Sequence, residues 1–241
     1  MTEDQELITE QGSDGVRIRS LQKVYYPSPP WLRVLVRTNI REPIHAIKEI
    51  NLDVAPGEIC AVVGPNGAGK TTTFRILVGL TTLTGGSARI MGYDCNDESP
   101  AVRRLVGWMP AEDRSLLMRL TCAENLHFHG RLQGMRGDHL RKRIVETLEQ
   151  VGLGHAHDNS VFSLSAGMRA RLQLARALLH SPEVLILDEP TGSVDPVASH
   201  ELLNLIIEIV AEERLATLIS SHRLEEIEAL HSHVILLDKG E

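Results

Sequence analysis

The segment 64–72 reads Gly-Pro-Asn-Gly-Ala-Gly-Lys-Thr-Thr and matches the phosphate-binding pattern G-x-x-x-x-G-K-[ST]. Glycine adopts positive φ at no steric cost, so the backbone N–H groups of such a loop can converge on one phosphate. A chance match in a chain of this length and composition has odds on the order of one percent. In this pattern the lysine reaches the β- and γ-phosphates and the following hydroxyl binds Mg²⁺. The predicted nucleotide-binding residues are therefore Gly64, Pro65, Asn66, Gly67, Ala68, Gly69, Lys70, Thr71 and Thr72, with Lys70 also catalytic and Thr71 a metal ligand.

A second motif places two carboxylates after an apolar run. The run Val184-Leu185-Ile186-Leu187 suits a central strand of a parallel sheet, and it ends in Asp188-Glu189-Pro190. A structural acid is usually single and solvated, whereas adjacent carboxylates at the end of a buried strand cost free energy unless they are used. We predict that Asp188 holds Mg²⁺ and that Glu189 polarises the attacking water. Together the two motifs predict that the chain binds and hydrolyses ATP.

Hydrophobic periodicity indicates the elements that must position these motifs. The apolar run 59–63 predicts a buried strand before the loop, and a helix from Thr71 to about Gly79 would add its positive end to the phosphate site. Upstream, the patterns predict strands at 16–19 and 50–54, and after the helix they predict a turn, strand and turn at 85–92. The pattern is helical over about 99–179, and it then predicts a helix at 196–213, a strand at 216–220, a helix at 223–230 and a strand at 234–237.

Composition limits the classes of function. The formal charge of −7 and the pI near 5.9 argue against a dedicated nucleic-acid surface, because binding a polyanion requires clustered Lys and Arg. The three cysteines lack C-x-x-C spacing, which favours a reducing compartment and no structural zinc. Three His-x-His triples suggest a metal site only weakly, because no Cys or carboxylate lies at ligand spacing. No apolar run approaches the ~20 residues of a membrane span, so we expect any membrane role to come through a separate partner.

The segment Leu164-Ser165-Ala166-Gly167-Met168 carries the most specific signal. It resembles the L-S-G-G-Q signature of ATP-binding cassette (ABC) ATPases, and the resemblance extends from about residue 16 to the last residue. A serine hydroxyl and a glycine at the start of a helix form a second anion site. In the family this site grips the γ-phosphate of ATP held by a second cassette. The resemblance implies that Ser165, Ala166 and Gly167 bind nucleotide across an antiparallel dimer interface.

Three further residues resemble family elements. Tyr25 resembles the aromatic that stacks on adenine, Asp195 belongs to a segment similar to the interface-crossing D-loop, and His222 resembles the switch histidine that contacts the γ-phosphate. The resemblance implies that Tyr25 and Asp195 bind nucleotide and that His222 is catalytic. Alone, Tyr25 would more often be an ordinary strand aromatic and His222 a residue at a helix start.

One position departs from the family pattern. A glutamine usually follows Gly-Tyr-x-Pro, but here Gly107-Trp108-Met109-Pro110 is followed by Ala111. The side chain that would bridge Mg²⁺, water and the transporter interface is therefore missing. We hypothesise that Glu112 or water replaces it.

The resemblance implies an α/β fold: a P-loop NTPase core with a mainly parallel sheet, an N-terminal antiparallel β subdomain and an inserted α-helical subdomain at about 99–179. We expect residues 1–15 to be a flexible tail and residues 16–241 to be a single cassette. The basic segment 31–41 is interpreted as a solvated surface loop, with contact to a membrane-side partner as the alternative.

The resemblance implies an ATPase subunit of an ABC transporter, most similar to exporters, with ATP and Mg²⁺ as cofactors. It would drive a separately encoded transmembrane permease and pair with a second cassette, as a homodimer in preference to a heterodimer, at the cytoplasmic face of the cell membrane. The alternative is a soluble ABC-type ATPase acting on nucleic acid or ribosomes, which the single cassette, the absence of a heptad run and the acidic charge disfavour. A small-molecule kinase is disfavoured because it would leave the 164–168 segment unexplained.

Overall fold

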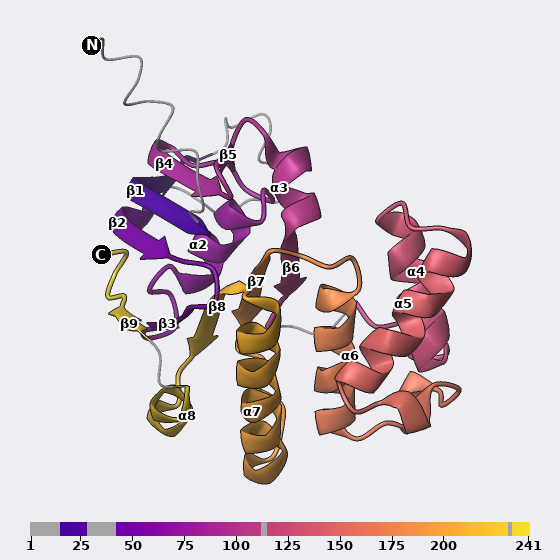
Figure 1. The fold of residues 1–241 in the computed structure, drawn as a ribbon. Helices are drawn as coiled ribbons and strands as arrows, with labels where there is room; N and C mark the ends of the chain where they lie inside the picture. Colours follow the sequence, from indigo (N-terminus) through magenta and orange to yellow (C-terminus); the bar gives the residue numbers. More distant parts are fainter. Residues whose placement is uncertain (1–14, 28–41, 112–114, 231–232) are drawn as a thin grey trace.

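The protein is built around a five-stranded parallel sheet (Figure 1). The structure, a computed structural model, describes residues 15–27, 42–111, 115–230 and 233–241. The sheet order is β6-β7-β8-β3-β9, and every neighbouring pair is parallel. The strands are β3 (Ile59–Val63), β6 (Val106–Met109), β7 (Val184–Asp188), β8 (Ala216–Ser221) and β9 (His233–Leu236).

The apolar run before Asp188 forms β7, which is buried on both faces of the sheet. Successive side chains of a strand point to opposite faces. Val184 and Ile186 accordingly join one hydrophobic cluster, and Leu185 and Leu187 join the other. A half-exposed strand alternates apolar and polar residues, whereas a strand covered on both faces needs apolar residues throughout. This requirement explains the continuous apolar run before Asp188.

A four-stranded antiparallel sheet of order β2-β1-β4-β5 lies beside the core sheet. Its strands are β1 (Val16–Tyr25), β2 (Ile44–Val54), β4 (Gly85–Ile90) and β5 (Tyr93–Asp94). Apolar residues of this sheet share one buried cluster with Phe74 and Leu77 of α2 (Lys70–Leu77). One face of the parallel sheet is therefore covered by α2 and the antiparallel sheet.

The opposite face packs against helices of the second half of the chain. The cluster there joins Leu185 and Leu187 to α6 (Ala166–Leu178) and α7 (Pro196–Glu213). In Figure 1, α4 (Cys122–Leu132) and α5 (Gly137–Gln150) lie beyond α6, on the side away from the antiparallel sheet. In the part of the chain that the structure describes, the remaining helices are α3 (Ser99–Leu105) and α8 (Leu224–Ala229), with short 3-10 turns at Gly154–Ala156 and Val161–Ser163.

The predicted α/β class, with a parallel P-loop core and an antiparallel N-terminal sheet, is confirmed. The prediction of a helical pattern throughout 99–179 is wrong at residues 106–109, which form β6 and pair with β7. This four-residue strand follows α3 directly, so no turn signal separates the two elements. The helices that lie apart from the antiparallel sheet begin only at Cys122, where Thr121 and Glu124 form a capping box.

Several predictions concern residues outside the described ranges. The tail up to residue 14, the basic segment 31–41 and Glu112 belong to this group. Among the described residues, no helix has the length and apolar character to cross a bilayer.

Candidate functional site

The phosphate-binding loop connects β3 to α2 at the carboxyl edge of the parallel sheet. Gly67 and Gly69 have φ of 85° and 108°, the left-handed region that favours glycine. A Cβ at Gly69 would lie 2.7 Å from the carbonyl oxygen of Ala46 on β2, so only glycine fits this close approach. The loop borders a cavity of about 150 Å³ lined by Ala46, Asn66, Gly67, Ala68, Gly69, Lys70, Thr71, Thr72 and Glu189.

Lys70 is held inside the loop that precedes it. Its ammonium group donates to the carbonyl oxygens of Gly64 at 2.6 Å and Pro65 at 3.3 Å, and the residue is 6% exposed. Both carbonyls are neutral, so the positive charge of Lys70 is not paired with a carboxylate by these contacts. A buried cation at a helix N-terminus whose described hydrogen bonds go to neutral carbonyls suits a ligand that carries several negative charges.

Thr71 and Asp188 meet beside this cation. The Thr71 hydroxyl donates to Oδ2 of Asp188 at 2.8 Å, and the Ser220 hydroxyl donates to Oδ1 at 2.6 Å. Asp188 is 2% exposed at the end of β7, whereas Thr71 is exposed. Hydroxyl and carboxylate oxygens are the donors that Mg²⁺ prefers, and Mg²⁺ is typically held by one or two such groups plus phosphate oxygens. The oxygens of Thr71 and Asp188 therefore fit a magnesium ion.

Glu189 follows Asp188, lines the phosphate cavity and has a strained backbone conformation. Its φ is 49°, an uncommon value for a residue other than glycine, and its backbone N–H donates to both the carbonyl oxygen and the hydroxyl of Ser220. The Nδ1 atom of His222 lies 3.4 Å from Oε2 of Glu189, and the two side chains are 53% and 25% exposed. A carboxylate that lines a phosphate cavity can orient a water molecule and accept its proton.

The segment 164–168, here called the signature segment, does not line the phosphate cavity. Ser165 caps α6, since its hydroxyl accepts from the Met168 N–H at 3.2 Å, and Asp195 caps α7 by accepting from Ala198 at 3.1 Å. Ser165 and Asp195 are exposed and do not line the phosphate cavity. A Cβ at Gly167 would lie 3.0 Å from Cβ of Ala198, so the starts of the two helices pack closely.

A neighbouring cavity of about 380 Å³ is lined by residues of both the signature segment and the phosphate site. Ala166 belongs to the first and Glu189 to the second. Ala111, which replaces the family glutamine, lines the same cavity, and so does Gln173 of α6. Glu189 is thus shared by both cavities. The amide of Gln173 was not singled out from the sequence, because only the packing of α6 brings it to this cavity.

Tyr25 ends β1 outside the phosphate cavity. The ammonium of Lys23 lies 4.9 Å from the centre of its ring. Tyr25 pairs with Ile44 at the start of β2, and Ala46 of the same strand lines the phosphate cavity. Stacking of Tyr25 on a nucleobase remains a prediction.

Two buried residues that sequence reasoning missed hold the carboxyl edge of the sheet together. Ser220 links Asp188 to Glu189, as described above. Glu226 of α8 accepts hydrogen bonds from Thr191 and Ser221. A serine inside an apolar strand and an acid in a short helix carry no motif, so only their contacts identify them.

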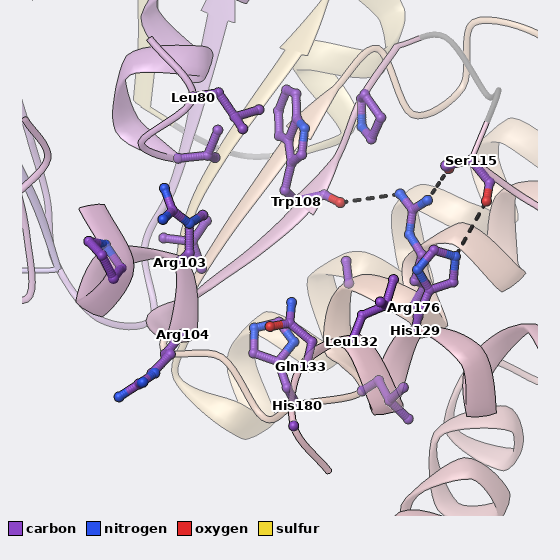
Figure 2. A pocket seen from close by; sticks show the side chains of 17 residues that line it. Leu80, Arg103, Arg104, Trp108, Ser115, His129, Leu132, Gln133, Arg176 and His180 are labelled. Atoms are coloured by element: carbon purple, nitrogen blue, oxygen red, sulfur yellow. Dashed lines mark hydrogen bonds between the residues drawn. The ribbon is translucent and has the colours of Figure 1, made fainter. Parts of the chain in front are cut away.

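A larger groove of about 620 Å³ lies between α3 and α4 and is drawn in Figure 2. Arg103 and Arg104 of α3 border one side, and the guanidinium of Arg176 lies between the Trp108 carbonyl and Ser115 on the other. Burial lowers the pKa of His129, and the nearby Arg176 cation adds to this effect against the opposing Ser115 carbonyl. No carboxylate is among the described residues that line the groove, so its surface is apolar and basic.

Comparisons with known proteins give a consistent result. A protein-family model described as "ABC transporter" matches residues 47–192. The bacitracin transport ATP-binding protein BcrA of Bacillus licheniformis is 40% identical over 195 residues, which cover 81% of this chain and 62% of that protein. The daunorubicin/doxorubicin resistance ATP-binding protein DrrA of Streptomyces peucetius is 35% identical over 195 residues, covering 81% of this chain and 58% of that protein.

A solved structure agrees in fold. The ATP-binding cassette MJ0796, crystallised as a dimer in a post-hydrolysis state with ADP and Pi, aligns with a TM-score of 0.78 and 26% identity over 94% of this chain and 95% of its own. The chain spans less than two thirds of the length of BcrA and of DrrA.

Proposed function

The chain belongs to the ABC transporter family, and on that basis we propose that it binds ATP with Mg²⁺ and hydrolyses it to drive a transporter. The observation that carries the proposal is the gathering of five side chains from three adjacent parallel strands. Lys70 and Thr71 follow β3, Asp188 ends β7 and Glu189 follows it, and His222 follows β8. Ligands of open parallel sheets bind at the carboxyl ends of the strands.

Each residue has one role in the proposed reaction. Lys70 and the loop N–H groups hold the β- and γ-phosphates, and Thr71 and Asp188 hold Mg²⁺. The metal ion would neutralise the charge that develops on the phosphates. Glu189 accepts a proton from the attacking water, while His222, 3.4 Å from Glu189, faces the γ-phosphate. Catalysis is then mainly positioning and charge stabilisation, which suits phosphoryl transfer.

We propose that ATP closes two copies of the chain into a symmetric dimer. Ser165 and Asp195 are exposed at helix N-termini outside the phosphate cavity, which suits contact with ATP held by a second copy. MJ0796 forms a dimer, which supports the same arrangement here. We prefer a homodimer to a heterodimer because both halves of the composite site are present in this one chain.

We further propose that the chain works with a separate permease at the cytoplasmic face of the membrane, in export. BcrA is named for bacitracin transport and DrrA for drug resistance, which supports this direction. The groove in Figure 2 supplies an apolar and basic surface that suits a permease segment carrying an acidic residue. The alternative of a soluble ATPase acting on nucleic acid or ribosomes has no support in the names of these relatives.

Glu189→Gln tests the catalytic part of the proposal. The variant should bind ATP but lose Mg-ATP turnover, and size-exclusion chromatography should show an ATP-dependent dimer that Ser165→Arg abolishes. Glu183→Gln is the matched control, because Glu183 is exposed just before the other end of β7. Wild-type turnover in Glu189→Gln would rule out Glu189 as the base, and failure to dimerise would rule out the homodimer.

Arg104→Glu tests the permease part. Reversing this charge should reduce the amount of co-expressed permease that purifies with the chain, whereas Arg141→Glu on exposed α5 should not. Equal recovery with both variants would remove the groove from the proposal.

A further inference from the structure

The geometry points to Glu226 as a positioning residue that ties the loop carrying Glu189 to the loop carrying His222. The inference rests on the proposed function, since it concerns how the two catalytic side chains keep their 3.4 Å separation. Glu226 acts on these two side chains through Thr191 and Ser221, with which it forms hydrogen bonds.

The buried carboxylate of Glu226 accepts several hydrogen bonds. Oε2 accepts from the Thr191 hydroxyl at 2.8 Å and from the Ser221 hydroxyl at 2.6 Å. Oε1 lies 3.1 Å from the Arg223 guanidinium, which supplies the opposite charge. Glu226 is 7% exposed, and Thr191 and Ser221 are 2% and 4% exposed. One carboxylate thus joins residues from two loops and α8.

The two hydroxyls mark the places where the catalytic loops leave the sheet. Thr191 follows Glu189 by two residues, in the loop that leads to Asp195. Ser221 ends β8 and immediately precedes His222. The Ser221 hydroxyl also accepts from the Arg223 N–H at 3.1 Å, which fixes the chain on the far side of His222. The Glu189 N–H is already bonded to Ser220, and the Glu226 bonds add a second link, between the segment that follows Glu189 and the end of β8 that precedes His222.

Anchoring α8 does not by itself require this carboxylate. Ile227 and Leu230 of the same segment are buried in the hydrophobic cluster that also contains Leu187. A buried ion pair is often no more stabilising than apolar residues of the same size, because both charges lose hydration. An apolar residue could not form directional hydrogen bonds to two hydroxyls. The proposed reaction needs the catalytic side chains to be placed to within about an ångström.

Steady-state kinetics of Mg-ATP hydrolysis by the full chain test the inference. Glu226→Ala should lower kcat at least about tenfold and change KM for ATP by less than about threefold, since the nucleotide-binding loop is not part of the link. Glu226→Gln keeps an oxygen acceptor for the hydroxyls and should recover most of kcat. Glu225→Ala, an exposed acid on the same helix, is the matched control and should behave as wild type.

A double-mutant cycle separates the link from a general loss of stability. Thr191→Val removes one hydroxyl donor at nearly constant volume, so it tests the link even if Glu226→Ala does not fold. It should lower kcat severalfold, and in the Glu226→Ala background it should cause little further loss. A wild-type kcat in Glu226→Ala, or in Thr191→Val where Glu226→Ala does not fold, would overturn the inference, and so would losses that multiply in the double variant. If the wild-type chain hydrolysed no Mg-ATP, the proposed function would fail first.

Discussion

The hydroxyl of Thr71 donates a 2.8 Å hydrogen bond to Oδ2 of Asp188, across 117 residues of sequence. The contact joins the start of α2, which follows β3, to the end of β7, and β8 lies between β3 and β7 in the sheet. Two hard oxygen donors therefore lie within hydrogen-bond distance of each other. Their closeness suits two ligands of one metal ion.

The first prediction concerns this pair. Thr71→Val removes the hydroxyl at nearly constant shape, so the Mg²⁺ concentration required for half-maximal ATPase activity should rise by about 10- to 100-fold, the usual cost of losing a metal-orienting group. A magnesium titration of the turnover rate measures it. Thr82→Val, at an exposed position, should leave the titration unchanged. An unchanged titration in Thr71→Val would exclude the hydroxyl from the metal site.

The second prediction concerns His222. Removing one charge-stabilising contact from a transition state typically costs on the order of 10²-fold in rate. His222→Ala should therefore lower kcat by about that factor, with a smaller effect on ATP affinity measured by a fluorescent nucleotide. His200→Ala, on an exposed position of α7, serves as the control. A loss of affinity equal to the loss of rate would indicate a role in binding only.

The third prediction concerns stability in mild acid. Burial lowers the pKa of His180, so the folded chain binds its proton less readily than the unfolded chain does. Stability from this group is present above the unfolded pKa of about 6.5 and is lost as the pH falls below it. Tm should therefore fall between pH 7.5 and pH 5.5. In His180→Gln the fall should be smaller, and an identical fall would show that His180 does not contribute.

The fourth prediction concerns the thiols. Burial raises the pKa of Cys60 and of Cys95 to about 12, with the neighbouring Glu58 and Asp94 adding to the effect, and it also raises the pKa of Cys122. With a pKa of 12, about one thiol in ten thousand is ionised at pH 8, and the thiolate is the reactive form. A thiol-reactive chromophore should therefore label the native chain very slowly and all three cysteines after unfolding. Rapid labelling of the native chain would contradict the described burial.

Much of the fold was predictable where neighbouring residues give a clear signal, such as a helix-start residue or a continuous apolar run. Helix α7 begins and ends at the predicted residues, because Asp195-Pro196 is a helix-start signal and Arg214 terminates the helix in a left-handed conformation. The strands β3 and β7 were recognised from continuous apolar runs that only a doubly covered strand needs. By contrast, β6 was missed because its four residues, including Gly107, carry no periodicity long enough to read.

The sequence alone determined the chemical groups and their local supports: the phosphate loop, the two carboxylates, the helix cap at Ser165 and the family. These depend on residues close together in the chain, where sterics and hydrogen bonding act over a few positions. Tertiary structure alone decided the sheet order, the contact of Thr71 with Asp188 and the contacts of Glu226 with Thr191 and Ser221. The contact of Thr71 with Asp188 joins residues 117 positions apart, and the packing of the strands and helices, which no short pattern encodes, brings them together.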